Sequence, residues 1–324
     1  MAEASKGCGG GRDKVASRRS TRFAGAELAA GVASGVASRL VVAPLDVLKL
    51  RLQVQTRVAS EARGKHVYSS MRHAVVQIVK TEGLVGLWRG NVAGNLMYMG
   101  YAPINFFVYH QIRVAASDND ADPSQPLPWM SSLAAGALSA SVATLATYPL
   151  DLMRTLFATQ GEPKVYHTLL ESTRIRISTD GLLGLYRGLG ITLVQTVPYV
   201  AIQLTLYEEV KARAFAHDNF RMPMWASAAV GASSGALAKF AVYPLDLVRR
   251  RMQVQGLERS AEYGGRLPSY TSSWQCLRAT LHLSGVRGLY QGLLPAMLKV
   301  IPASIVTFVA YEESIKLFRR LDRA

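Results

Sequence analysis

The sequence predicts an all-α membrane protein with six transmembrane helices, arranged as three pseudosymmetric two-helix repeats around a central pathway. Three observations predict this fold class. Several long stretches contain no Asp, Glu, Lys or Arg. Only 18% of the 324 residues are charged, against about 25% in soluble domains. A short motif that contains proline recurs three times, about 100 residues apart.

The six spans divide into two groups by their charge. A helix needs about 20 apolar residues to cross a bilayer. Arg39, Lys239 and Lys299 lie well inside three of the spans, where a charge costs at least ~2.5–3.5 kcal/mol. We therefore expect these cations to face a water-filled cavity. The spans without charge are 91–112, 127–150 and 188–207, and the interrupted ones are 24–45, 223–245 and 292–311.

The repeats follow from two motifs that alternate along the chain. PLDVLK, PLDLMR and PLDLVR begin at Pro44, Pro149 and Pro244. EGLVGLWRG, DGLLGLYRG and SGVRGLYQG follow them and end at Gly90, Gly188 and Gly292. Partly helical spacing between the motifs predicts surface helices over 70–81, 167–178 and 273–284. The predicted organisation is a basic, flexible N-terminal tail (1–22) and three repeats (23–113, 127–211 and 223–318).

The charge and the reactive residues restrict the function. A net charge of +15 alone suggests nucleic acid or an anionic surface, but the low charged content favours a membrane protein without a nucleic-acid partner. Lys and Arg outnumber Asp and Glu in the long loops 54–90, 157–187 and 254–291, which predicts that these loops face the negative compartment. No Ser/His/Asp, Cys/His or metal-ligand set converges, so we expect no enzyme, cofactor or metal.

The first motif places acids and bases near a helix kink. Proline inside a helix removes a hydrogen bond and bends it. An aspartate follows each repeat proline by two residues, and a base follows three residues later. A local i,i+3 pair is one interpretation. Pairing between helices is the other, and it would close the pathway on one side. The residues are Asp46, Lys49, Asp151, Arg154, Asp246 and Arg249.

The triplet P-x-[DE]-x-x-[KR], followed by [WY]-[KR]-G, resembles the mitochondrial carrier family over about residues 23–318. The resemblance implies alternating access, usually exchange, by a multi-pass monomer in the mitochondrial inner membrane, with cardiolipin as a lipid partner. It also implies a matrix-side gate with the pairs Asp46–Arg154, Asp151–Arg249 and Asp246–Lys49. Glutamines brace this gate at Gln53 and Gln253, whereas repeat two has Ala158.

A second, cytoplasmic gate is expected to be weak. The family pattern [FY]-[DE]-x-x-[KR] is complete only at Tyr207, Glu208 and Lys211. Repeat one has His110 with Arg113 in these places, and repeat three has Tyr311 with Ser314.

The resemblance places substrate contacts at mid-depth. They fall near Met97, Gly100, Tyr101, Asn105, Gln195, Thr196, Tyr199 and Lys299, and on the odd-numbered helices at Arg39, Thr144 and Lys239. Three cations, Arg39, Lys239 and Lys299, have no obvious opposing acid and suit a phosphorylated anion. Tyr98, Tyr101 and Tyr199 could stack on a flat ring or pack between helices.

Local resemblance suggests the substrate. RTLFATQGEPKVY (154–166), WRGNVAGNLM (88–97) and VTFVAYE (306–312) look like plant and algal thiamine pyrophosphate carriers. The expected function is exchange of thiamine pyrophosphate, against a nucleotide or thiamine monophosphate. The alternative is a carrier of adenine nucleotides or coenzyme A, because PLDLVRRRMQ is similar to nucleotide carriers, although it lacks RRRMMM. A receptor or scaffold is a third hypothesis. The aspartates and bases of the first motif and the cationic cavity disfavour it, because a receptor needs neither.

Overall fold

The computed structural model describes residues 10–55, 68–116, 129–215, 224–257, 259, 265 and 267–321, and these residues form helices and connecting segments with no strand. They fall into two compact units. Unit 1 takes its described residues from Met1–Val42 and Ile301–Ala324, and unit 2 is Ala43–Val300. The candidate site described below lies within unit 2.

Two long helices supply unit 1. Helix α1 (Gly10–Val54) contributes its residues up to Val42, and α12 (Val300–Leu321) contributes those from Ile301 on. Ser38 Oγ donates a hydrogen bond to the Ala303 carbonyl over 3.0 Å and so links the two helices. The segment 1–22, expected to be a flexible tail, lies outside the described residues up to residue 9, and its backbone is helical from Gly10 on.

Unit 2 is built on long helices that carry prolines. Helix α4 (Asn91–Ala116) packs along α5 (Trp129–Thr159), and α7 (Leu189–Phe215) contacts α5, α8 (Met224–Ala241) and α9 (Tyr243–Val254). Pro103, Pro149 and Pro198 lie inside α4, α5 and α7 without dividing them.

Two of the expected spans are divided. Span 223–245 breaks at Val242 (φ −92°, ψ 6°), just before the repeat proline Pro244. Proline has no N–H to continue a helical ladder and clashes with the preceding turn, so the new helix α9 starts here with Pro244 in its first turn. Span 292–311 comprises α11 (Leu293–Leu298) and α12, which meet at Lys299.

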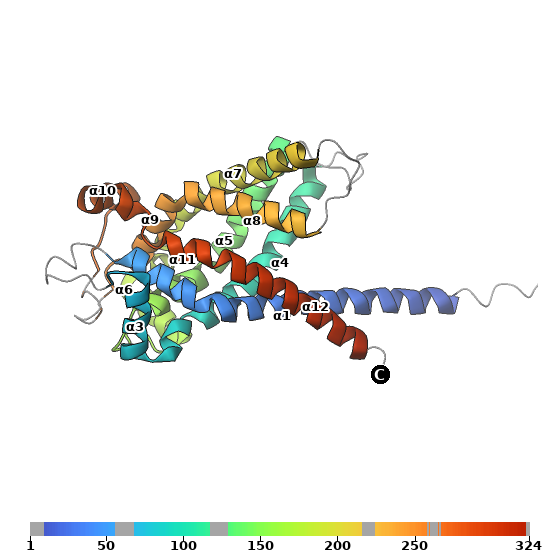
Figure 1. Cartoon of the computed structure of the whole chain (residues 1–324), viewed down its shortest axis with the longest axis horizontal. Coiled ribbons are helices and arrows are strands. Elements are labelled where there is room, and N and C mark those ends of the chain that lie inside the picture. The colour runs from blue at the N-terminus through green and yellow to red at the C-terminus, as the bar shows by residue number, and fades with distance from the viewer. Residues whose placement is uncertain are drawn as a thin grey trace, which may run out of the picture. The chain divides into compact units, whose positions relative to one another are not determined.

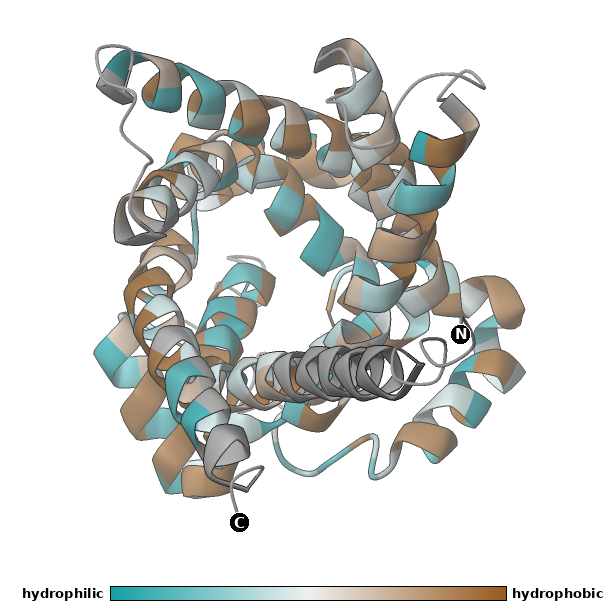
Figure 2. Cartoon of the chain, turned by 90° about the vertical axis from the view of Figure 1, so that its right-hand side faces the viewer, coloured by the Kyte–Doolittle hydropathy of each residue, from teal (hydrophilic) through white to brown (hydrophobic). Residues whose placement is uncertain are grey.

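Four stretches of the described residues are long and apolar enough to cross a membrane: Ala30–Val54, Met130–Thr159, Leu182–Arg213 and Leu293–Ser314. Helix α4 has 26 residues, which is long enough, but it carries polar residues such as Asn95 and Asn105. Large apolar side chains such as Phe106 and Phe107 are exposed, and hydrophobic segments run along the helices (Figure 2). This pattern suits helices that are surrounded by lipid.

Three shorter helices follow the repeat motif: α3 (Met71–Glu82), α6 (Leu169–Asp180) and α10 (Ser273–Leu289). They lie toward one end of unit 2 (Figure 1), and their positions agree with the expected surface helices. Each begins at a hydroxyl N-cap, Ser70, Thr168 or Ser272, whose side chain accepts a hydrogen bond from the backbone three residues on.

Glycines end the loop helices in the first two repeats. Gly83 (φ 71°) and Gly181 (φ 70°) lead into the short 3-10 helices η1 (Leu84–Trp88) and η2 (Leu182–Tyr186). In repeat three Gly285 (φ 61°) bends α10 at the same place. A positive φ is readily adopted by glycine, so the first glycine of the second motif sets this turn.

The apolar core of unit 2 fixes the ends of the kinked helices. Leu152 and Leu156 of α5 are fully buried in a cluster with Tyr166 and Val254, and Val47 and Leu48 of α1 pack with Ile78 of α3 in another. Burial of these faces leaves the aspartates and bases on the remaining face of the same helix ends. The core therefore orients these charged residues toward the interior of unit 2, where the candidate site lies.

Candidate functional site

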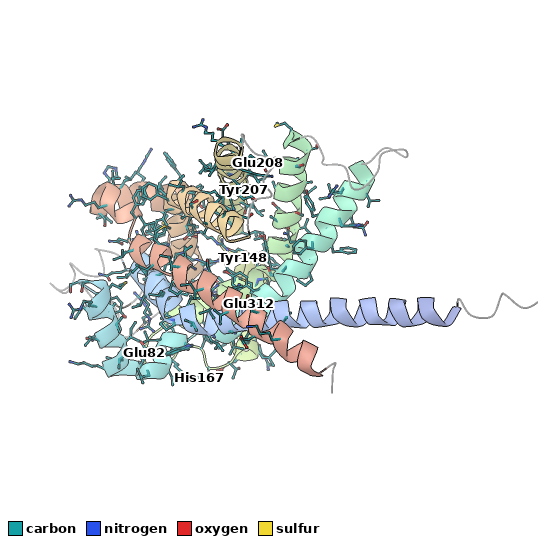
Figure 3. All side chains as sticks on the ribbon, turned by 45° about the vertical axis from the view of Figure 1, so that its right-hand side comes forward. Glu82, Tyr148, His167, Tyr207, Glu208 and Glu312 are labelled. Carbon is teal, nitrogen blue, oxygen red and sulfur yellow. The ribbon has the colours of Figure 1, made fainter. Side chains whose placement is uncertain are left out.

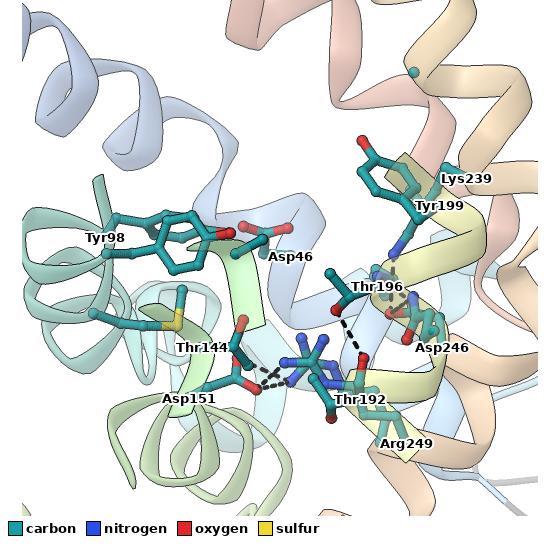
Figure 4. A pocket seen from close by; sticks show the side chains of 18 of the residues that line it. Asp46, Tyr98, Thr144, Asp151, Thr192, Thr196, Tyr199, Lys239, Asp246 and Arg249 are labelled. Atoms are coloured by element: carbon teal, nitrogen blue, oxygen red, sulfur yellow. Dashed lines mark hydrogen bonds and ion pairs between the residues drawn. The ribbon is translucent and has the colours of Figure 1, made fainter. Parts of the chain in front are cut away.

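Unit 2 contains a cavity of about 640 Å³, within the range of about 300–1,000 Å³ usual for small-molecule sites. Segments from all three sequence repeats line it (Figure 4). Its charged lining residues are Asp46, Lys49, Asp151, Arg154, Lys239, Asp246, Arg249, Arg250 and Lys299. The cavity thus brings together residues that are about 250 positions apart in the chain.

Three ion pairs join the repeats at the cavity. Arg154 Nη2 lies 2.6 Å from Asp46 Oδ2, and Arg249 Nη2 lies 2.6 Å from Asp151 Oδ2. Lys49 Nζ lies 2.7 Å from Asp246 Oδ2. These are the interhelical pairs expected from the sequence. Each repeat gives one acid to one neighbour and one base to the other, so the three pairs connect all three repeats.

Each of the three carboxylates also holds a second cation. Lys299 Nζ lies 2.7 Å from Asp46 Oδ1, and Lys239 Nζ lies 2.9 Å from Asp246 Oδ1. Arg250 Nη1 lies 3.1 Å from Asp151 Oδ1 and 3.0 Å from Oδ2. All three second cations belong to repeat three, so this repeat supplies the excess positive charge of the cavity.

The expectation that Lys239 and Lys299 have no opposing acid was therefore wrong. Lys239 lies in the last turn of α8 and Asp246 in the first turn of α9, on either side of the break at Val242. The lysine ammonium reaches the carboxylate across that break. Lys299 stands at the junction of α11 and α12 and reaches Asp46 of another repeat.

Glutamine side chains complete two of the three carboxylate sites. Gln253 Nε2 donates to Asp151 Oδ2 over 2.8 Å, and Gln53 Nε2 donates to Asp246 Oδ2 over 3.1 Å. Repeat two has Ala158 at the equivalent position, and the Asp46 side chain is the most exposed of the three, at 14% against 5% and 1%. Asp46 is thus the least enclosed carboxylate of the set.

Sequence reasoning missed Arg250 as a site residue. Its Nη1 also donates to Thr155 Oγ1 and Gln253 Oε1, each over 2.8 Å, while its Nε is buried without a hydrogen-bond partner. The signal available in the sequence was the run Arg249–Arg251, which offers two cations more than the single base of the family pattern.

Most of the other residues that were expected to contact the substrate also line the cavity. Thr144, Gln195 and Thr196 line it, and Gln195 Nε2 lies 3.5 Å from Asp246 Oδ1 while its buried Oε1 has no hydrogen-bond partner. Met97 lines it as well. Gly100 and Asn105 are not among the described lining residues. Arg39 belongs to unit 1, so its role at the cavity stays a prediction.

Aromatic side chains also line the cavity. Tyr98 and Tyr101 come from α4, and Tyr199 comes from α7. Tyr98 lies on the side of the view opposite Lys239 and Asp246 (Figure 4). The Arg154 guanidinium is 5.6 Å from the centroid of the Tyr98 ring, a distance typical of a cation–π contact.

The other end of α7 carries the complete family pattern of the second gate. Tyr207 and Glu208 lie there, well away from Glu82 and His167 (Figure 3). The ion pair found on this part of α7 joins Glu209 and Arg213 over 3.1 Å, and both side chains are exposed. A cytoplasmic gate that uses Tyr207, Glu208 and Lys211 stays a prediction.

Glycines of the second motif allow the repeats to approach. Gly90 and Gly292 have φ of 78° and 80°. A Cβ at Gly90 would lie 2.6 Å from the Arg154 carbonyl oxygen, and one at Gly292 would lie 2.9 Å from the Lys49 carbonyl oxygen. Larger residues would separate the helix ends that carry the charged groups.

Charged links near the loop helices differ between repeats. Glu82 pairs with Arg51 and with Arg89 Nη1, the latter over 2.8 Å, and Arg89 also pairs with Glu162. Repeat three has Ser284 in place of this acid. There Arg251 donates instead to the Gln53 carbonyl over 3.0 Å and to Thr280 Oγ1 over 2.7 Å. Arg251 is therefore a structural link outside the cavity.

Comparison with known proteins assigns the family. The model of the "mitochondrial carrier protein" family matches three times, over residues 20–120, 125–218 and 220–322. A "mitochondrial thiamine pyrophosphate carrier 1" of Neurospora crassa is 39% identical, covering 91% of this chain and 92% of the relative. "Mitochondrial thiamine diphosphate carrier" proteins of Zea mays and Arabidopsis thaliana are 38% and 37% identical, over 87% and 88% of this chain and 91% and 92% of their own. The chain therefore belongs to the mitochondrial carrier protein family.

Proposed function

We propose that this chain carries thiamine pyrophosphate across the mitochondrial inner membrane by alternating access, in exchange for a nucleotide or thiamine monophosphate. The observation that carries the proposal is the cavity in unit 2, where six cationic and three carboxylate side chains lie beside tyrosine rings. The printed names of the relatives from fungi and plants support the same substrate.

The charge of the cavity suits a diphosphate. The described lining residues carry three positive charges in excess of their carboxylates. A fully ionised diphosphate ester carries about three negative charges. Such a match lowers the cost of moving the anion out of water, because guanidinium and ammonium groups donate short, charge-assisted hydrogen bonds to phosphate oxygens. A cationic amino acid would be repelled.

The tyrosines suit the other end of the substrate. The thiazolium ring of thiamine is a cation, and aromatic faces attract cations. Tyr98 and Tyr101 belong to repeat one, whereas Lys239, Arg250 and Lys299 all belong to repeat three. This separation favours a ligand with an anionic end and a cationic aromatic end, placed across the cavity.

The ion pairs suit a gate, and we call Asp46, Asp151 and Asp246 the gate carboxylates. Six helices in three repeats, in a single chain, would surround one pathway that these interrepeat pairs close on the side of the loop helices. Opening requires the pairs to separate while the other end closes. In this arrangement the chain acts as a monomer, with cardiolipin as a lipid partner at the membrane surface.

The test is transport by the purified chain in liposomes that contain cardiolipin. Vesicles loaded with unlabelled thiamine pyrophosphate should take up the labelled compound by counter-exchange, and vesicles loaded with buffer alone should take up far less. Thiamine monophosphate, ADP, ATP and coenzyme A are the competing substrates. Exchange of ADP or coenzyme A without exchange of thiamine pyrophosphate would refute the substrate assignment.

A binding measurement gives an independent readout. A ligand present at about 100 times its Kd stabilises the folded state by about 2.7 kcal/mol. Thiamine pyrophosphate should therefore raise the unfolding temperature of the carrier in detergent, whereas thiamine, which lacks the diphosphate, should raise it much less. An equal effect of the two compounds would argue against recognition through the phosphates.

A further inference from the structure

We propose that Arg250 completes a diphosphate-binding set with Lys239 and Lys299, and that the bound diphosphate withdraws these three cations from the gate carboxylates. This inference rests on the proposed function, because it assumes a phosphorylated substrate in this cavity. It adds a binding residue and a physical link between binding and opening of the gate.

The first support is the arrangement of the three cations. Each is the second cation on a different gate carboxylate: Lys299 on Asp46, Lys239 on Asp246 and Arg250 on Asp151, at 2.7, 2.9 and 3.0 Å. In each case a different base forms the interrepeat ion pair with that carboxylate. Arg250 therefore occupies the same relation to its acid as the two lysines do to theirs.

The second support is that the three cations are not needed to neutralise the acids. Lys49, Arg154 and Arg249 already provide one positive charge for each gate carboxylate. Burying a further cation costs free energy unless an anion compensates for it. The second cation on each carboxylate therefore exceeds what neutralisation of the gate requires, and an anionic substrate supplies the compensating charge.

The third support is the donor capacity of Arg250. It lines the cavity, it places Nη1 on Asp151, Thr155 and Gln253, and its buried Nε has no hydrogen-bond partner. Guanidinium groups hold phosphate through two parallel N–H donors. Rotation of the side chain away from Asp151 would offer such a pair of donors to a phosphate oxygen pair.

A consequence for the gate follows from this sharing. Phosphate oxygens and gate carboxylates compete for the same three cations, so a bound diphosphate removes one of the two cations from each carboxylate. Each gate carboxylate then keeps only its interrepeat base and its glutamine, where one is present. Binding thus weakens the closed gate at three points at once, without contact between the substrate and the interrepeat bases.

The experiment uses inorganic pyrophosphate as the probe and the full-length carrier in detergent. Titrations followed by thermal shift give its apparent affinity for the wild type, Arg250→Gln and Arg250→Lys. Arg251→Gln is the matched control, because Arg251 is the next residue, is also buried, and contacts Thr280 and the Gln53 carbonyl instead of the cavity. Inorganic phosphate serves as the single-phosphate comparison.

We expect Arg250→Gln to weaken pyrophosphate binding about tenfold or more, with partial recovery in Arg250→Lys. Arg251→Gln should lower the starting unfolding temperature, because it removes buried hydrogen bonds, but should leave the affinity within about twofold. Affinities for Arg250→Gln and Arg251→Gln that fall together would overturn the proposal, as would no loss in Arg250→Gln. If Arg250→Gln does not fold, the loss or retention of affinity in Arg250→Lys relative to Arg251→Gln decides the question.

The sharing of cations has its own test. Asp151→Asn removes the competitor of the phosphates and should tighten pyrophosphate binding, and this gain should shrink in the Asp151→Asn/Arg250→Gln double variant. Equal gains in both backgrounds would overturn the link through Arg250. Failure of the proposed function looks different: pyrophosphate would still bind through Arg250, while liposomes would not exchange thiamine pyrophosphate.

Discussion

The gate carboxylate Asp151 gives the sharpest test of the charge arrangement. Its side chain is 5% exposed and lies 2.6 Å from Arg249 and 3.0 Å from Arg250. Gln253 donates to it as well, over 2.8 Å. Asp151→Asn keeps the shape of the side chain and removes its charge, so two buried guanidinium groups then face each other without an anion. Arg249→Gln, in contrast, leaves the carboxylate with Arg250 and Gln253.

The contacts give different magnitudes for the two changes. Removal of one partner from a buried ion pair costs about 3–5 kcal/mol when it leaves an uncompensated charge. Asp151→Asn meets that condition, so we expect a loss of about 3–5 kcal/mol in the free energy of unfolding. Arg249→Gln removes one charge-assisted hydrogen bond from an anion that keeps another cation, which corresponds to about 1.5–3 kcal/mol. Asp151→Asn should therefore be the more damaging change.

The assay compares unfolding midpoints of the purified variants in the same detergent and lipid, followed by tryptophan fluorescence. Glu209→Gln is the control, because its pair with Arg213 is solvent-exposed and should contribute less than about 1 kcal/mol. Equal destabilisation by Asp151→Asn and Arg249→Gln would show that Arg250 does not hold Asp151 in the closed state, and it would refute the reasoning.

Three further changes test other parts of the structure. Lys299→Ala removes one cation from the cavity and should lower uptake of thiamine pyrophosphate at least about tenfold, whereas Lys316→Ala, which alters an exposed contact with Glu313, should leave uptake unchanged; equal uptake by both would refute a role for Lys299. Gly90→Ala should destabilise by roughly 1–3 kcal/mol more than Gly181→Ala, because both positions have positive φ but only Gly90 meets backbone at close range; equal unfolding midpoints would contradict this. Burial raises the pKa of the Cys276 thiol to about 11, so in a Cys8→Ser background its alkylation should be slow at pH 8 and accelerate as pH approaches 11; fast alkylation at pH 8 by the folded protein would contradict the burial.

Much of the helical layout could be predicted from the sequence, because it depends on local features. Stretches without charge indicated the long helices, and partly helical apolar spacing indicated the loop helices α3 and α6 to within two residues of their ends. The division at Val242 was not predicted. Pro149 and Pro244 occupy the same motif position, yet α5 continues through the first and α9 begins at the second, so tertiary packing decides between a bend and a break.

The candidate site was predictable in its pairs but not in its second contacts. The interrepeat pairs followed from motif positions shared with the family. Lys239 and Lys299 were placed in the cavity, but their contact with Asp246 and Asp46 depends on the reach of a lysine side chain and on the depth of the helix junction at Lys299. Linear spacing carries no information on depth between different helices. Arg250 was missed because it lies outside the repeated positions.

In the proposed mechanism, these second contacts let a symmetric gate serve an asymmetric substrate. The interrepeat pairs draw one acid and one base from each repeat, so every repeat takes part in two of the three pairs. The second cations all come from repeat three, and they reach the carboxylates of all three repeats. In that mechanism, a diphosphate bound to repeat three would act on every gate carboxylate, although it would contact one side of the cavity. Three symmetric binding sites, one per repeat, would require a substrate with three anionic ends to produce the same effect. With the excess charge on repeat three, the proposed mechanism places the ring at the other end of the substrate beside the tyrosines of repeats one and two.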